Sequence, residues 1–208
     1  MTDAALTLYG LRLSGHSHRA ELFLSLLGLP YRFVEVGSAV QRSADAFRRL
    51  NPLGQIPVLT DGAAVIPDSN AILVYLAARY APDGGWMPTD PLGAAQVQRW
   101  LSIAAGEVRH GPGQARLMVV FGAPGDRTIV HAAAARILTF MDTHLADRTY
   151  FAADRPTLAD IACYSYVAHA PEGGVSLTPY AAVRAWIARV EALPGFIPMP
   201  ASPIPETV

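Results

Sequence analysis

The first third of the chain alternates between short apolar runs typical of strands and a longer segment of helical period. Residues 6–9 alternate as a half-buried strand does, and residues 31–36 form a second run of this kind. Between them, apolar residues recur at helical spacing from Ser17 onward until Gly28-Leu29-Pro30 ends the helix. A strand, a helix and a strand over this length predict a βαβ unit, whose two strands are parallel.

The segment that follows predicts an antiparallel hairpin. Pro57 has no N–H to donate to a ladder, so it belongs at the first residue of a strand. The dipeptide Asp61-Gly62 favours a two-residue turn, which pairs residues 58–60 with residues 63–66.

Two more helices complete this part of the chain. Residues 44–50 have the composition of a short helix, and a longer one starts at Ser69, beside the good N-cap residues Asp68 and Asn70. The resulting order of elements is β-α-β-α-β-β-α. We therefore expect an α/β domain over residues 1–81.

The rest of the chain has almost no strand signal. Residues 82–91 contain three prolines and two glycines, which predicts a linker. Residues 92–121 have helical spacing, and we expect a bend or break where Gly111-Pro112-Gly113 interrupts them.

Further helices are expected after Asp126, after the capping box Thr157-x-x-Asp160 and over residues 180–192. We therefore expect an all-helical domain over residues 92–208. Its tail, from residue 194, is rich in proline and is expected to run extended over the surface.

Composition narrows the class of protein. With 208 residues, 51% of them hydrophobic and 16% charged, the chain is globular, and its net charge of −1 gives no sign of nucleic acid or an anionic membrane as a partner. The longest apolar run, residues 71–78, is far shorter than the roughly 20 residues of a membrane helix. No signal-peptide pattern opens the sequence, and a single cysteine, Cys163, forbids an internal disulfide, so we expect a cytoplasmic protein. No His/Cys cluster has ligand spacing, so we expect no metal.

The chain around Pro57 suits a small, extended, zwitterionic peptide. If the Ile56–Pro57 bond is cis, the backbone N–H and C=O of Ile56 point away from the sheet and can pair with an added strand. The helix start at Ser69 has free N–H groups and a positive dipole end, which favour a carboxylate, and the neighbouring Asp68 can hold an amine.

Residues 51–72 resemble the glutathione-binding segment of the glutathione transferases. In that family the residue before a cis-proline pairs its backbone with the cysteinyl part of glutathione, and an acidic residue followed by serine holds the γ-glutamyl end. The resemblance implies that Ile56, Pro57, Asp68 and Ser69 bind glutathione. The alternative is that Asp68 and Ser69 only cap a helix.

The loop before the first helix is the expected place for chemistry. A helix N-terminus stabilises a nearby thiolate, and a hydroxyl that donates to the sulfur lowers the thiol pKa from about 8.5 toward neutrality. Residues 14–19 resemble the catalytic loop of the serine-type transferases, with Ser14 at the position of the hydroxyl that contacts the thiol. Ser17 and His16 are alternatives for this role, and no cysteine in the loop matches the cysteine-type relatives.

Two further residues are weaker candidates for glutathione. A basic residue ahead of the second helix often meets the glycyl carboxylate in this family, which implies a role for Arg42, and Gln55 adjoins Ile56. The alternative for Arg42 is an ordinary surface arginine.

The resemblance covers nearly the whole chain and implies a thioredoxin-like N-terminal domain followed by an all-α C-terminal domain. It also implies a homodimer along the helix from Ser69 and the first C-terminal helix, and a second substrate, a small hydrophobic or anionic electrophile, between the domains. Arg109 and Arg116 are hypothesised to favour an anionic electrophile. The wider set of lining candidates is Leu11, Arg12, Leu13, Arg109, Arg116, Met118, Phe121, Tyr164 and His169.

The function that the sequence predicts is activation of glutathione as a thiolate that attacks this electrophile. A glutathione-dependent isomerase, peroxidase or disulfide reductase on the same scaffold is an alternative, as is a non-catalytic interaction protein. The electrophile itself cannot be read from the sequence, because function lies in a site placed on a widely shared fold.

Overall fold

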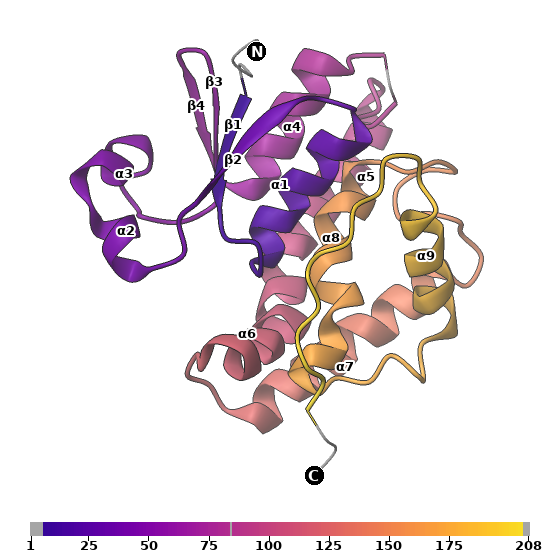
Figure 1. Ribbon diagram of the computed structural model, residues 1–208. Coiled ribbons are helices and arrows are strands. Elements are labelled where there is room, and N and C mark those ends of the chain that lie inside the picture. Colours follow the sequence, from indigo (N-terminus) through magenta and orange to yellow (C-terminus); the bar gives the residue numbers. More distant parts are fainter. Residues whose placement is uncertain (1–5, 84, 206–208) are drawn as a thin grey trace. The chain divides into compact units, whose positions relative to one another are not determined.

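The computed structural model describes residues 6–83 and 85–205. Among these, residues 6–83 and 194–200 form one compact unit, and residues 85–193 and 201–205 form a second. Figure 1 shows the elements of both units along the chain.

The first unit is built on a four-stranded mixed sheet in the order β2-β1-β3-β4. Its strands are β1 (Leu6–Gly10), β2 (Tyr31–Glu35), β3 (Val58–Asp61) and β4 (Ala64–Pro67). The β1 strand runs parallel to β2, as the βαβ pattern predicts, and antiparallel to β3. Gly62 has a φ of 57° in the turn between β3 and β4, a conformation that glycine adopts without steric cost.

Four helices accompany this sheet: α1 (Gly15–Leu26), α2 (Ala39–Ser43), α3 (Asp45–Leu50) and α4 (Ser69–Tyr80). Helices α1 and α4 lie on one side of the sheet, and α2 and α3 lie on the other (Figure 1). The thioredoxin-like order of the sequence analysis is therefore confirmed, with α2 as an addition. The sequence analysis missed α2, whose start is a capping box in which Gln41 N–H donates to Ser38 Oγ over 3.1 Å.

The apolar interior of this unit lies on both faces of the sheet. On the α1 and α4 side, fully buried side chains include Leu8, Leu22, Phe23, Leu59, Ile72 and Leu76. On the α3 side, the partly buried Ile56 packs against a buried cluster of Val36, Phe47 and Val58. The residue before Pro57 is therefore held by packing and does not lie in a loose loop.

The second unit contains helices and no strand over the residues described, as predicted. Its elements are α5 (Pro91–Ile103), the π-helix η1 (Ala104–Gly113), α6 (Gln114–Phe121), α7 (Arg127–Leu145), α8 (Leu158–Ala168), the short 3₁₀ helix η2 (Ala170–Gly173) and α9 (Ala181–Glu191).

The path through residues 111–113 differs from the expected bend or break. The chain stays helical there in π form and continues into α6. A Cβ on Gly111 would lie 3.0 Å from the backbone of Ala134, so the glycine permits η1 to pack closely on α7. Packing against α7 therefore favours a continuous helical path over the break that Pro112 alone favours.

The buried side chain of Asp160 accepts hydrogen bonds from three parts of this unit. Its Oδ2 accepts from Thr157 N–H over 2.9 Å, which confirms the capping box, and its Oδ1 accepts from Trp186 Nε1–H over 2.9 Å and from Phe151 N–H over 3.1 Å. Burial raises the pKa of Asp160 above its usual value, although these hydrogen bonds favour the charged form.

A buried ion pair joins α6 to η2. Arg116 Nε lies 2.6 Å from Glu172 Oε2, and both side chains are almost wholly buried. Glu172 Oε1 also meets His169 Nδ1 at 2.6 Å and accepts from Ser202 N–H over 3.1 Å. Burial raises the pKa of Glu172, but the bonds with His169, Ser202 and Arg116 outweigh it, and the pKa lies below the usual value.

The proline-rich tail is divided between the units. Its first part belongs to the first unit, where Ser25 Oγ donates to Gly195 C=O over 2.7 Å and His18 Nε2 lies 2.9 Å from Ile197 C=O. The sequence analysis places all of residues 92–208 in one domain. It could not foresee these two contacts, because hydrogen bonds between residues 170 or more positions apart leave no pattern in the sequence.

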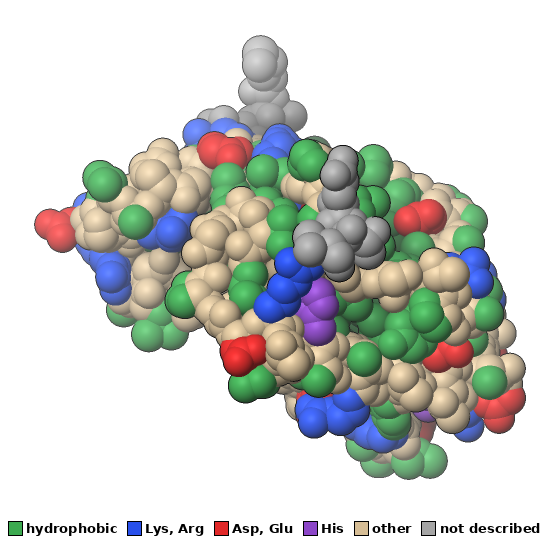
Figure 2. All heavy atoms as spheres, turned by 90° about the horizontal axis from the view of Figure 1, so that it is seen from below, with side chains coloured by type: hydrophobic (Ala, Val, Ile, Leu, Met, Phe, Trp, Pro, Cys, Tyr) green, Lys and Arg blue, Asp and Glu red, His purple; other side chains and the backbone are tan. Residues whose placement is uncertain are grey.

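Two general features bear on partners. On the face shown in Figure 2, basic side chains lie in separate groups among acidic ones, without a continuous field of one sign. Within residues 6–83 and 85–205, no helix is both long and apolar enough to cross a membrane.

We predict that Asp160→Asn lowers the free energy of unfolding by about 2–4 kcal/mol, because its amide NH₂ must face buried donors where an oxygen now accepts. Urea denaturation at pH 7 measures this, with Asp83→Asn, at an exposed turn, as the control that changes stability little. A loss below about 0.5 kcal/mol would show that the network is not needed for stability.

A second prediction concerns pH. Because the pKa of Glu172 is lower in the folded protein than its usual 4.5, its stabilising contribution is present above that pH and is lost as pH falls through the folded value. Glu172→Gln should cost about 3–5 kcal/mol at pH 7, where it leaves Arg116 buried without its carboxylate, and the difference from wild type should shrink toward pH 3. Urea titrations across that range measure both, and a difference independent of pH would contradict the assignment.

Candidate functional site

The register of the sheet brings three separate segments together at one end of its strands. We call this end of the sheet the edge of the first unit. Tyr9 pairs with Val58, and Val58 pairs with Pro67. The loop that follows β1, the residues that precede β3 and the residues that follow β4 therefore meet at the same end of the sheet. Helices α1 and α4 both begin there, so that two positive dipole ends face this edge.

Ile56 and Pro57 form the middle of the edge. Their peptide bond is cis, which meets the condition set out in the sequence analysis. No hydrogen bond within the described residues uses the backbone N–H or C=O of Ile56. Sequence reasoning missed the role of Asn51, which is buried and donates from Nδ2 to Gln55 C=O over 2.9 Å, thereby fixing the loop ahead of Ile56.

Asp68 has an unusual backbone. Its φ of 76° makes it the only non-glycine residue with positive φ among those described, a conformation that costs about 1–3 kcal/mol. Its Oδ1 accepts from Asn70 N–H and Ala71 N–H, each over 2.9 Å, so it caps α4. The carboxylate is exposed, and no hydrogen bond within the described part of the chain uses Oδ2. The cap therefore engages one oxygen of this side chain and leaves the other facing solvent.

Ser69 does not act as a cap. Only 3% exposed, it lies in a polar cluster between α1 and α4, where its Oγ accepts from Arg19 Nη1–H over 2.8 Å and lies 3.2 Å from His16 Nδ1. Arg19 also donates from Nη1 to Asn70 Oδ1 over 2.8 Å. Because a guanidinium only donates, the proton of the Ser69 hydroxyl is directed elsewhere, toward His16 Nδ1 or a bound group.

The sequence analysis names Asn70 only as a helix-cap candidate and gives Arg19 no part in binding. The signal that was present is the spacing of His16 and Arg19, which are three residues apart on α1 and therefore share a helix face. Nothing local shows that this face meets α4, since the residues it contacts lie about fifty positions later in the chain.

The three candidates for the thiolate role have different surroundings. Ser14 is half-buried and caps α1 by accepting from Ser17 N–H over 3.3 Å. Ser17 is fully buried, and its Oγ accepts from Leu11 N–H over 3.1 Å and lies against Gly10. A ligand at the surface therefore cannot reach Ser17, whereas Ser14 and His16 are only partly covered.

Arg42 and Gln55 are less closely involved. Arg42 is half-buried and donates to the carbonyl oxygen of Gly37, within its own segment. A Cβ on Gly54 would lie 3.1 Å from the Arg42 carbonyl oxygen, so α2 runs beside the loop that carries the exposed Gln55. Neither side chain contacts Ile56, Asp68 or Ser69 by any hydrogen bond in the part of the chain that is described.

The lining candidates of the second unit are mostly engaged inside it. Arg116 is buried and paired with Glu172, so the expectation that it attracts an anionic substrate is corrected. Tyr164 is buried and donates to Glu191 Oε1 over 2.9 Å, and burial raises the pKa of its hydroxyl. Arg109 is partly exposed and donates to Gln114 Oε1 over 2.9 Å.

The described residues, with their gaps at 1–5, 84 and 206–208, contain no group of three or more metal-ligating side chains. The edge of the first unit instead offers an extended backbone, a carboxylate, hydroxyls and two helix N-termini, which are the groups that hold a short peptide with both charges.

Two models of known protein families match the chain. Residues 8–84 match the family model described as the N-terminal domain of glutathione S-transferase, and residues 126–194 match the model of its C-terminal domain.

Individual relatives extend over nearly the full chain. Glutathione S-transferase 3 of Zea mays is 32% identical, with 96% of this chain and 98% of that protein covered. A Ralstonia protein named maleylpyruvate isomerase is also 32% identical, with 86% and 88% covered. The structure of a theta-class glutathione S-transferase from Xanthomonas axonopodis pv. citri, with glutathione bound, is 31% identical at a TM-score of 0.82, with 92% and 95% covered. The chain therefore belongs to the glutathione S-transferase family.

Proposed function

We propose that this protein binds glutathione at the edge of the first unit and activates its thiol for attack on a small electrophile. The observation that carries the proposal is the sheet register, which brings Ser14, Ile56 and Asp68 to one end of the sheet. Family membership and the glutathione-bound relative support glutathione as the co-substrate.

The backbone of glutathione is assigned to Ile56. Its N–H and C=O take part in no hydrogen bond within the described residues, and a peptide laid beside it gains two such bonds as an added strand does. Pro57 fixes the direction of the chain at this point. Arg42 is assigned to the glycyl carboxylate, with weaker support because it already donates to Gly37. Gln55, which is exposed beside Ile56, is assigned to the same backbone that Ile56 binds.

The γ-glutamyl end is assigned to Asp68 and Ser69. The solvent-facing oxygen of Asp68 suits the amino group, and the start of α4 with the Ser69 hydroxyl suits the carboxylate. Arg19 supports this arrangement, because it orients the Ser69 oxygen and places a buried positive charge behind it.

Ser14 is assigned to the thiol. Its oxygen accepts a backbone N–H of α1, so its own proton is available to a sulfur atom, and the N-terminus of α1 adds a favourable field. The thiolate then forms the S–C bond, and either a leaving group departs with its electron pair or the adduct takes a proton from water. His16 is assigned a supporting part, since its Nδ1 lies against Ser69 and Arg19.

A second candidate function is glutathione-dependent isomerisation, in which the thiolate adds to the substrate and is later expelled. The Ralstonia relative named maleylpyruvate isomerase favours this alternative. Product analysis separates the two reactions, since isomerisation regenerates glutathione and transfer consumes it.

The proposal further includes a homodimer, a cytoplasmic location and an electrophile that is hydrophobic or anionic. Because Arg116 is paired with Glu172, Arg109 is the remaining candidate to attract an anionic electrophile.

We predict that Asp68→Asn weakens glutathione binding by about 10-fold to 100-fold, because it removes a charged acceptor. Asparagine also caps helices and tolerates positive φ, so this variant should keep the stability of wild type within about 1 kcal/mol. Calorimetric titration measures the affinity, and urea denaturation of the same samples measures stability. Wild-type affinity in Asp68→Asn would remove this residue from the site and leave it as a helix cap.

We predict that Ser14→Ala raises the pKa of bound glutathione by about one unit or more, equivalent to about 1.4 kcal/mol per unit, because the donor to the sulfur is lost. Ser14→Thr, which keeps both the hydroxyl and the helix cap, is the matched control. Thiolate absorbance against pH, at saturating glutathione, measures the shift. An unchanged pKa in Ser14→Ala together with a raised one in His16→Ala would move the role to His16.

A further inference from the structure

The turn between β1 and α1 carries Arg12 two residues ahead of Ser14. Ser14 N–H donates to the Leu11 carbonyl oxygen over 2.9 Å and closes the turn, and Leu11 N–H donates to Ser17 Oγ over 3.1 Å. A Cβ on Gly10 would lie 2.7 Å from Ser17 Oγ, so the end of β1 packs directly on the start of α1. Any force on the tip of this turn therefore acts on the backbone that places the Ser14 hydroxyl.

The Arg12 side chain is anchored outside the turn. Its Nη1 lies 2.6 Å from Oε1 of Glu21, in the middle of α1, and its guanidinium carbon lies 4.2 Å from the centroid of the Phe33 ring on β2. A guanidinium held both by a carboxylate and by a ring face has little freedom to move. The side chain thus joins the turn to α1 and to β2, two elements that the packed core of this unit holds in place.

The carboxylate that receives Arg12 is itself fixed. The Glu21 side chain is only 7% exposed, and its Oε1 also accepts from the Tyr31 hydroxyl over 2.8 Å. Burial raises the pKa of Tyr31, and the bond with Glu21 raises it further, so the hydroxyl remains a donor at neutral pH. Tyr31 and Phe33 are two residues apart on β2 and therefore point to the same face of the strand. Arg12 thus meets an acceptor and a ring that are already in position.

This ion pair has more effect on position than on stability. The Arg12 side chain is 52% exposed, and pairs with such exposure contribute little to the free energy of unfolding, because solvent screens them. The activation of a thiol is far more sensitive, since a displacement of about 1 Å breaks a hydrogen bond of ordinary length. Loss of the pair should therefore affect the Ser14 hydroxyl while the unit stays folded.

We propose that Arg12 is a positioning residue for the reaction, which by binding Glu21 holds the turn so that Ser14 Oγ donates to the glutathione sulfur. The inference rests on the proposed function, because Arg12 acts through the Ser14 hydroxyl. The rival interpretation is that the half-exposed guanidinium of Arg12 acts by its charge, on the sulfur or on an anionic electrophile.

The test measures thiolate absorbance of bound glutathione against pH in Arg12→Met and in Glu21→Met. We expect each variant to raise the thiol pKa by about 0.5 or more, because a displaced hydroxyl stabilises the thiolate less. Arg12→Met added to Ser14→Ala should raise the pKa no further than Ser14→Ala alone, since two changes that break one link are not additive.

The signs of the two changes separate position from charge. Arg12→Met removes a positive charge and Glu21→Met removes a negative one, so an effect of charge alone would raise the thiol pKa in the first and lower it in the second. Positioning predicts that both rise. Affinity for S-methylglutathione, which has no thiol to ionise, should stay within about 2-fold of wild type in both variants, because its backbone and γ-glutamyl contacts do not use this turn.

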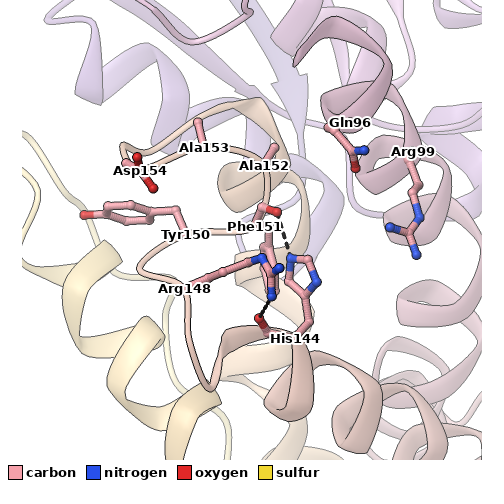
Figure 3. Close-up of a pocket in the computed structure, with 9 residues that line it drawn as sticks. All are labelled: Gln96, Arg99, His144, Arg148, Tyr150, Phe151, Ala152, Ala153 and Asp154. Carbon is pink, nitrogen blue, oxygen red and sulfur yellow. Dashed lines mark hydrogen bonds between the residues drawn. The ribbon is translucent and has the colours of Figure 1, made fainter. Parts of the chain in front are cut away.

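Arg148→Met is the matched control. The Arg148 side chain is 49% exposed and lies 2.5 Å from Asp147 Oδ1, values close to those of the Arg12 pair. It belongs to the second unit, where it lines a pocket and donates to the His144 carbonyl oxygen (Figure 3). Because this pair joins two neighbouring residues of one segment, its loss should leave the thiol pKa unchanged.

Four results would overturn the proposal. An unchanged thiol pKa in Arg12→Met, with the variant folded by circular dichroism, removes Arg12 and leaves the glutathione site intact. A lowered pKa in Glu21→Met assigns the effect to charge. A further rise when Arg12→Met is added to Ser14→Ala shows that Arg12 does not act through that hydroxyl. Loss of S-methylglutathione affinity by about 10-fold or more shows general damage to the site.

Failure of the proposed function would look different. Wild-type protein would then bind no glutathione, or would leave the pKa of the bound thiol at its usual value of about 8.5, before any substitution is made. That result removes the positioning role together with the thiolate mechanism.

Discussion

The candidate site depends on one register in the sheet of the first unit, in which Val58 stands opposite both Tyr9 and Pro67. Side chains alternate along a strand, so a slip of one residue would turn Val58 from the α3 face of the sheet to the face that α1 and α4 cover. It would also shift Ile56, which packs with Val58 and Phe47, away from the ends of β1 and β4. The burial of these apolar residues therefore fixes the relative positions of a backbone, a carboxylate and a hydroxyl that are far apart in the chain.

The parts of this arrangement that follow from local chemistry could be predicted from the sequence. A proline before a strand, an Asp-Gly turn and a cluster of N-cap residues act over a few positions, and the structure has the cis bond, the hairpin and the start of α4 where these signals place them. The capping box of Thr157 and Asp160 is equally local.

The features that the sequence analysis missed depend on contacts between residues far apart in the chain. Arg19 matters because α1 meets α4, and Arg116 is unavailable to a ligand because Glu172, 56 residues later, pairs with it in the interior. Ser14 and Ser17 look alike in the sequence, and only burial separates them. The helical path through Pro112 likewise follows from the close approach of Gly111 to α7, which outweighs the local preference for a break. Local propensity gives way to tertiary packing at each of these places.

The central claim is that this edge holds glutathione by both of its ends and by its backbone. The most direct measurement is a calorimetric titration of the wild-type protein with glutathione and, separately, with cysteinylglycine, which has the same thiol and glycyl end but lacks the γ-glutamyl group. The account predicts saturable binding of glutathione at millimolar concentration or below, and binding of cysteinylglycine weaker by about 10-fold or more, because Asp68, Ser69 and the start of α4 lose their ligand. Equal affinities, or no heat of binding with several millimolar glutathione, would contradict it.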